Sequence, residues 1–255
     1  QRFPWFMKEH PKLLLPFIKK AVEKWNFSDY DLVITSSSAW VKNITVPENT
    51  RHLCYCHTPA RMLWDSWPGY IDQMKLLFVL RLYLIRLASR LRLWDYYQSQ
   101  RNTEFIANDN YVAERIKKFY RKPSQVIYPP VKTKQLIPEG NVNKKDYYVI
   151  VSVLSNYKNI QLAIKAFIKN GKKLVIAGDG PVFSELQKLA QGHNNIEFKG
   201  RVSGSQKASL LQQARAFVFC SIEDFGISMV EAISAQTPVV ALRGGGAIEI
   251  VKEGI

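Results

Sequence analysis

The chain has 255 residues, 47% of them hydrophobic and 22% charged, which is typical of a globular protein with one large or two moderate domains. Its three cysteines are too few for a disulfide framework and fit a reducing compartment. A net charge of +15 suits nucleic acid, an anionic membrane or a phosphorylated substrate, and does not choose among them.

The first elements expected along the chain are a helix and two strands. Apolar residues three and four apart predict an amphipathic helix over 11–25. Apolar runs predict buried strands over 30–35 and 51–56. In the second strand, Cys54 and Cys56 would share one face, and we expect them to be buried free thiols.

The sequence pattern predicts neither a signal peptide at the start of the chain nor a closing helix or strand at its end. Residues 2–10 lack the long apolar core of a signal peptide, and the first residue is Gln1. We therefore expect a fragment, with both of its domains truncated at the chain ends.

His57 follows the strand at 51–56 directly, with Thr58 and Pro59 after it. In an open parallel sheet, ligands bind beyond the carboxyl ends of the strands. This position favours a histidine in a binding cleft, with an ordinary surface histidine as the alternative.

A long basic helix is expected over 72–100. Arginines interrupt its apolar residues, so no run approaches the roughly 20 residues needed to span a bilayer. Such a helix either lies on an anionic membrane surface, here through residues 75–101, or packs on its own domain with the arginines in water.

A change of composition divides the chain. A short strand at 103–106, a helix ending at Phe119 and a strand at 126–128 complete the first part. Residues 132–146 are polar and without periodicity, which is typical of a linker. We expect domains at 1–131 and 147–255.

The second domain repeats one pattern, a buried strand followed by a loop and an amphipathic helix. This alternation predicts an α/β fold with a parallel, right-handed βαβ sheet. The expected strands are 148–154, 173–178, 196–199, 216–220 and 239–242, and the expected helices are 160–169, 182–191, 206–213 and 228–235.

Residues 221–232 hold the features on which the function depends. A strand end, the turn at Gly226 and a helix start at Ile227 and Ser228 fall within a few residues. Gly226 has no Cβ to keep a ligand from the backbone, and the helix start suits a phosphate.

Charged side chains flank this turn. Glu223 and Glu231 have seven residues between them, and near a phosphate they would accept hydrogen bonds from neutral hydroxyls. Lys158, after the first strand of the domain, could neutralise a diphosphate. The alternatives are a helix-capping Glu223 and a solvated Glu231 and Lys158.

The pattern Glu223-x-Phe225-Gly226, followed by Glu231 and an alanine, resembles the E-x7-E signature of glycosyltransferase family 4. Residues 56–65, Cys-His-Thr-Pro-x-Arg-x-x-Trp-Asp, are similar to bacterial members that build surface polysaccharides. The resemblance implies a retaining, metal-independent, nucleotide-sugar-dependent enzyme with the two Rossmann-like domains of the GT-B fold.

The resemblance also implies roles for particular residues. His57 would contact the donor sugar near its reacting carbon, and Glu223 would bind the sugar hydroxyls. Lys158 would bind the donor phosphates and Glu231 the ribose. The remaining donor-binding residues would be Phe225, Gly226, Ile227, Ser228, Gly178, Gly180 and Val202.

Two positions depart from the family pattern. Val153 stands where the family has a phosphate-binding arginine, and Lys132 stands where it has an acid. No role is carried over to either residue. Asp29-Tyr30-Asp31 spells a metal-binding D-x-D, but it precedes a strand, so we expect no metal site.

We therefore expect a transferase that moves a hexose, in one reading mannose, from a GDP- or UDP-linked donor to a glycan or polyprenyl-linked acceptor, with no cofactor. It would be cytoplasmic, at the inner face of a membrane, and would not bind nucleic acid. The alternatives are another GT-B enzyme such as a nucleotide-sugar epimerase, or a non-catalytic protein that binds nucleotide-sugars or nucleic acid.

Overall fold

The computed structural model describes residues 15–65, 78–252 and 254. Residues 11–14 of the first expected helix and 72–77 of the long expected helix lie outside this part. The chain divides into two compact units, Gln1–Tyr128 and Pro129–Ile255, and each is described by itself.

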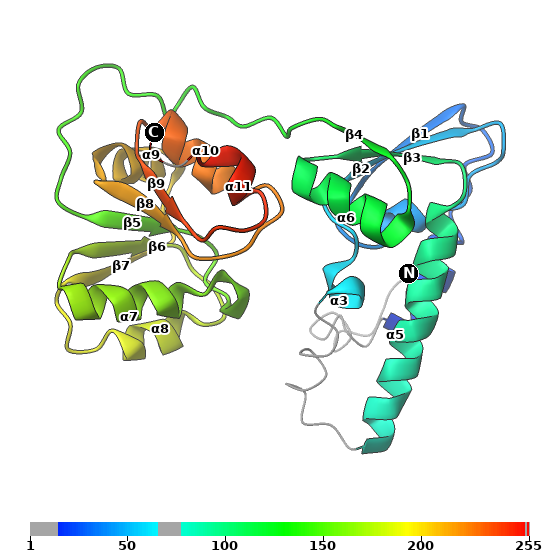
Figure 1. Ribbon diagram of the computed structural model, residues 1–255, viewed down its shortest axis with the longest axis horizontal. Coiled ribbons are helices and arrows are strands. Elements are labelled where there is room, and N and C mark those ends of the chain that lie inside the picture. The colour runs from blue at the N-terminus through cyan, green and yellow to red at the C-terminus, as the bar shows by residue number, and fades with distance from the viewer. Residues whose placement is uncertain (1–14, 66–77, 253, 255) are drawn as a thin grey trace. The chain divides into compact units, whose positions relative to one another are not determined.

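The N-terminal unit is built on a four-stranded parallel sheet in the order β1-β2-β3-β4 (Figure 1). Its described elements are α2 (Leu15–Val22), β1 (Leu32–Ser37), η2 (Val41–Asn43), β2 (Arg51–Cys56), α3 (Arg61–Trp64), α5 (Phe78–Ser99), β3 (Thr103–Ala107), α6 (Asn110–Tyr120) and β4 (Ser124–Val126).

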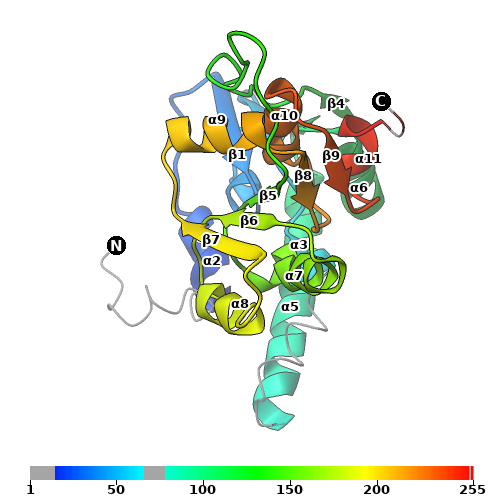
Figure 2. The same ribbon diagram turned by 90° about the vertical axis from the view of Figure 1, so that its left-hand side faces the viewer.

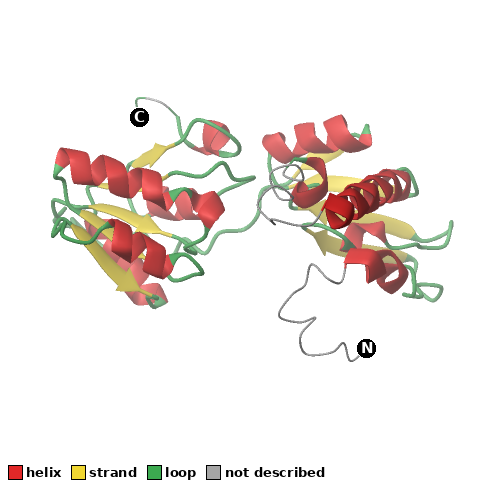
Figure 3. Cartoon of the chain, turned by 90° about the horizontal axis from the view of Figure 1, so that it is seen from below, coloured by secondary structure: helices red, strands yellow, loops and turns green. Residues whose placement is uncertain are grey.

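One face of this sheet is buried and the other is largely open. Side chains alternate across a strand, and in β1 every second residue is buried. The buried face includes Cys54 and Cys56, which are free thiols and fully buried, as expected. On the open face Ile34 is 67% exposed. Figure 3 looks from the helix side of this unit and shows helices in front of its strands.

A buried ionic network fixes α5 to the rest of the N-terminal unit. Lys42 and Asp95 form an ion pair with side chains 1% and 0% exposed. Asp95 also accepts hydrogen bonds from Asn43 Nδ2 (2.8 Å), Trp64 Nε1 (2.7 Å) and Tyr120 Oη (2.8 Å). A buried charge is tolerated when it is paired and hydrogen-bonded in this way.

The C-terminal unit has a five-stranded parallel sheet in the order β7-β6-β5-β8-β9. Its elements are β5 (Tyr148–Val151), η3 (Asn156–Lys158), α7 (Ile160–Asn170), β6 (Leu174–Ala177), α8 (Phe183–Leu189), β7 (Ile196–Gly200), α9 (Gly204–Gln213), β8 (Ala216–Phe219), α10 (Ile227–Ser234), β9 (Val239–Ala241) and α11 (Ala247–Ile250).

Helices cover both faces of this second sheet (Figure 2). One core joins Ile164 of α7 and Leu186 of α8 to strand residues such as Ile176. The other joins Leu211 of α9 and Met229 of α10 to the opposite face. This confirms the expected α/β class, with a Rossmann-like parallel sheet in each of the two units.

Several boundaries differ from the expected ones; for example, the first strand covers Leu32–Ser37 instead of 30–35, and β5 ends at Val151 instead of at residue 154. The fourth strand is Ser124–Val126, not 126–128, because the pairing with β3 ends where Val126 meets Ala107 and Pro129 follows soon after. The expected linker, 132–146, lies within the second unit, since Leu136 is 3% exposed in its core cluster. Its backbone turns at Thr133, whose carbonyl accepts from Leu136 N at 2.8 Å.

Candidate functional site

The candidate site lies at the carboxyl edge of the C-terminal sheet. The strand order reverses between β5 and β8, which places the loops that follow these two strands beside each other. Such a switch point is where open α/β sheets bind ligands. Lys158 lies in the loop after β5, and Glu223 lies in the loop after β8.

Lys158 and Glu223 meet in an ion pair across the two loops. The Lys158 Nζ bonds to Glu223 Oε1, and the side chains are 15% and 23% exposed. Ser221 Oγ donates to the same carboxylate oxygen at 3.1 Å. Two residues predicted to serve different parts of a ligand thus neutralise each other in the structure.

A second carboxylate–lysine pair lies on the neighbouring helices. Glu231 of α10 accepts from Lys207 Nζ of α9 at 2.6 Å, with side chains 16% and 28% exposed. Both residues line a cavity of about 530 Å³. The expected donor-binding residues Gly178, Gly180 and Val202 line the same cavity. Lys207 could not be predicted from the sequence, because nothing in the pattern of a single helix marks it as facing Glu231.

The two glycines of the cavity have a packing role. A Cβ on Gly178 would lie 1.8 Å from the Ser152 carbonyl oxygen, and one on Gly180 would lie 2.3 Å from that of Leu154. Leu154 N also donates to Asp179 O at 2.9 Å. The lack of a side chain is therefore required by the close approach of two loops, and this holds with or without a ligand.

The expected phosphate-binding turn begins α10. Gly226 has φ of 83°, a left-handed conformation suited to glycine, and it caps the helix. The ring of Phe225 is buried, whereas Ile227 is 48% exposed. The first turn of a helix presents N–H groups without intrahelical acceptors. The backbone N–H groups of Ile227 and Ser228 are therefore the part of this turn suited to bind an anion.

A glycine loop supports the backbone of Glu223. Gly246 N donates to Glu223 O at 2.9 Å. Gly245 has φ of 61°, and a Cβ there would lie 2.0 Å from the same carbonyl oxygen. The loop at 244–246 thus helps to place one of the two carboxylates.

Cys220 directly follows β8, the strand that leads into the site. Burial raises the pKa of its thiol, so this cysteine is held protonated and is a poor nucleophile. Across the residues that the structure describes, no group of three or more His, Cys, Asp or Glu side chains is placed to hold a metal ion.

In the N-terminal unit, His57 lies just beyond the carboxyl end of β2. Its Nε2 is 2.8 Å from Ser36 Oγ, and its backbone N donates to Ser37 O at 2.8 Å. Tyr55 packs edge-on to the imidazole at 5.2 Å between ring centroids. The imidazole is thus held at a strand end, where the sequence placed it.

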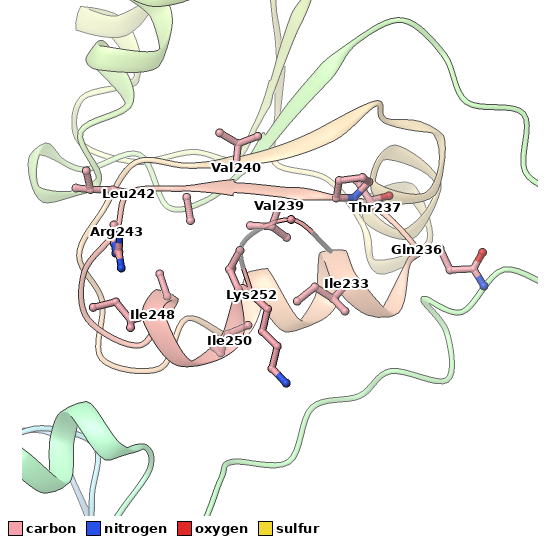
Figure 4. A pocket seen from close by; sticks show the side chains of 15 residues that line it. Ile233, Gln236, Thr237, Val239, Val240, Leu242, Arg243, Ile248, Ile250 and Lys252 are labelled. Atoms are coloured by element: carbon pink, nitrogen blue, oxygen red, sulfur yellow. The ribbon is translucent and has the colours of Figure 1, made fainter.

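A larger cavity lies elsewhere on the C-terminal unit, beside β9 and α11 (Figure 4). It measures about 930 Å³, and its lining is mainly aliphatic, as at Val240, Leu242 and Ile248. Arg243 and Lys252 add two basic side chains. None of the predicted site residues lines it, so it is distinct from the candidate site.

Comparisons with known proteins identify relatives of the C-terminal unit and of the whole chain. Residues 131–255 match the family model of glycosyl transferases group 1. D-rhamnosyltransferase WbpZ of Pseudomonas aeruginosa is 32% identical over 139 residues, which cover 49% of this chain and 36% of that protein. Alpha-1,3/1,6-mannosyltransferase ALG2 of Candida albicans is 26% identical over 265 residues, 80% of this chain and 57% of that one.

The fold is shared with solved glycosyltransferase structures. Anabaena Alr3699/HepE in complex with UDP superposes with a TM-score of 0.61 at 16% identity, covering 95% of this chain and 66% of that one. The chain spans 36%, 45% and 57% of the length of three curated relatives that it matches. The C-terminal unit is a domain of the glycosyl transferases group 1 family, in a chain with the two-sheet GT-B fold.

Proposed function

We propose that this chain belongs to a retaining glycosyltransferase that moves a hexose, in one version mannose, from a nucleoside diphosphate to a glycan or lipid-linked acceptor. The observation that carries the proposal is the pair of carboxylates at the edge of one sheet, each beside a lysine. The similarity to the mannosyltransferase ALG2 supports mannose as the transferred sugar. The similarity to Alr3699/HepE, which was solved in complex with UDP, supports a nucleoside-diphosphate donor.

The chemistry requires stabilisation of a leaving diphosphate. The bond between the anomeric carbon and the diphosphate oxygen breaks, and its electron pair leaves with the diphosphate. Lys158 and the N–H groups at Ile227 and Ser228 would stabilise this charge. Lys158 would exchange Glu223 for the phosphate, which frees the carboxylate to accept hydrogen bonds from sugar hydroxyls.

The acceptor supplies the second half of the reaction. Its hydroxyl oxygen would bond to the anomeric carbon on the face that the diphosphate leaves, and its proton would pass to the departing phosphate oxygen. His57 would contact the donor sugar near that carbon. The proposal includes no metal and no cofactor besides the nucleotide-sugar substrate.

The composition of helix α5 supports a lipid-linked acceptor, which the protein would reach at a membrane surface. Between Phe78 and Trp94 it carries four arginines and no acid, and Phe78 and Val79 are 72% and 78% exposed. A basic helix with exposed apolar side chains suits an anionic bilayer surface. These features support our proposal that the protein acts at the cytoplasmic face of a membrane. No helix in the described ranges is long and apolar enough to cross one.

Calorimetric titration with GDP, UDP, ADP and their sugars tests the donor site. We expect one nucleotide to bind selectively, and Glu231→Ala to weaken it at least tenfold, since hydrogen bonds to a charged group contribute about 1.5–3 kcal/mol. Glu185→Ala removes an exposed carboxylate of α8 and serves as the matched control.

The salt dependence separates a site from a basic surface. The contrary result is that all the nucleotides bind equally, that their binding weakens at high salt, and that Glu231→Ala does not change it. The nucleotides would then bind non-specifically to a surface with a net charge of +15, and the transferase proposal would fail.

A further inference from the structure

Lys207 contacts Glu231, the carboxylate expected to bind the ribose. Its Nζ lies 2.6 Å from Glu231 Oε1 inside the cavity of about 530 Å³. The contact joins residues 24 positions apart in the chain, on two different helices.

Both side chains come from firmly anchored helices. Ser203 caps α9 through a capping box, accepting from Gln206 N at 3.3 Å while Ser203 N donates to Gln206 Oε1 at 2.8 Å. A capping box fixes the first turn of a helix, and Lys207 lies in that turn. Glu231 is adjacent in sequence to Ala232, which is fully buried in the core. The backbone positions of Lys207 and Glu231 are therefore fixed by the packing and capping of their helices.

The pair offers complementary groups to a diol. Lys207 uses one of three ammonium donors on Glu231, and within the described part of the chain Glu231 Oε2 makes no hydrogen bond. A hydroxyl can donate to a carboxylate and accept from an ammonium at the same time. A vicinal diol can thus use both partners, and the lysine also cancels a charge that would repel the diphosphate of the same ligand.

We propose that Lys207, as the partner of the Glu231 carboxylate that the family resemblance assigns to the ribose, selects ribonucleotides over 2′-deoxyribonucleotides. The inference rests on the proposed function, because it assigns the nucleotide of the donor to this cavity. It adds a specificity-determining residue that no sequence motif identified.

The test compares UDP with 2′-deoxy-UDP, and GDP with 2′-deoxy-GDP, by calorimetry. We expect the wild-type chain to bind the preferred ribonucleotide about tenfold more tightly than its deoxy form, as for loss of one charge-assisted hydrogen bond. In Lys207→Met this ratio should fall to about one to three, mainly through weaker ribonucleotide binding. Lys207→Arg, which keeps a donor, should restore part of the ratio.

Lys165→Met is the control, since it removes an exposed lysine of α7 and lowers the net charge equally. Thermal unfolding of each variant checks that the fold is intact. An unchanged ratio in Lys207→Met, with binding still lost in Glu231→Ala, overturns the role of Lys207 and leaves the proposed function standing. If neither nucleotide binds the wild-type chain, both proposals fall.

Discussion

His52 is a buried histidine held between two threonine hydroxyls in the N-terminal sheet. Its Nε2 is 2.9 Å from Thr35 Oγ1 and its Nδ1 is 3.0 Å from Thr103 Oγ1, and the residue is 1% exposed. Burial lowers its pKa from 6.5 to about 4, because a charged imidazole would lose its hydration. His52 is thus a structural residue of the buried core, whereas His57 lies at the strand end.

This pKa makes the stability of the N-terminal unit depend on pH. The unfolded chain binds a proton at His52 below pH 6.5, whereas the folded chain does so only near pH 4. Stability is therefore full above pH 6.5 and falls as the pH drops to 4, by up to about 3 kcal/mol. Denaturant unfolding at a series of pH values, followed by tryptophan fluorescence, measures the loss.

The fluorescence is specific because all six tryptophans lie in the first 128 residues. His52→Gln should remove most of the pH dependence between 6.5 and 4, while His193→Gln, at an exposed histidine, should keep it. An equally steep dependence in His52→Gln would assign the effect to other groups.

At the scale of elements, α5 carries the prediction of membrane binding. Arg86 and Arg90 lie on this helix, and each basic residue near an anionic surface contributes about 1 kcal/mol. The double variant Arg86→Gln, Arg90→Gln should therefore bind vesicles that contain phosphatidylglycerol roughly 30-fold more weakly. Co-sedimentation measures the partition.

A variant of equal charge serves as the comparison. Lys169→Gln with Lys188→Gln removes two exposed lysines of the C-terminal unit and should change binding little. Vesicles of phosphatidylcholine alone should bind weakly. Equal binding to both vesicle types, or equal loss in both double variants, would rule out α5 as the docking element.

Elements with a strong pattern could be predicted from the sequence, and short ones could not. β2 begins at Arg51 and ends at Cys56 as expected, because its alternation leaves one register that buries both cysteines. The four-residue helices α3 and α11 are too short to show a helical period, so the sequence pattern did not predict them.

For the candidate site, the sequence predicted positions in the fold, and the contacts between the side chains could not be predicted. The sequence pattern predicted that Lys158 and Glu223 follow strand ends at one edge of a sheet, with Glu231 in the helix that begins after Glu223. The partner of Glu231, Lys207, depends on how α9 and α10 pack on that sheet. The packing role of Gly178 likewise depends on the Ser152 carbonyl, which reaches it only in the folded sheet.

At the scale of the whole molecule, stability is divided between the units. Each of the four core clusters lies within one unit, two in each. Both carboxylate–lysine pairs of the candidate donor site lie in the C-terminal unit. A nucleotide that binds there stabilises the folded form of that unit by mass action.

We therefore expect urea unfolding of the full chain to show two transitions. Tryptophan fluorescence reports the N-terminal one, and circular dichroism reports both. Nucleotide at 100 times its Kd should stabilise the C-terminal transition by about 2.7 kcal/mol and leave the fluorescence midpoint unchanged. A fluorescence midpoint that shifts with the nucleotide would mean that the two units unfold in one cooperative transition. Nucleotide binding would then stabilise both units.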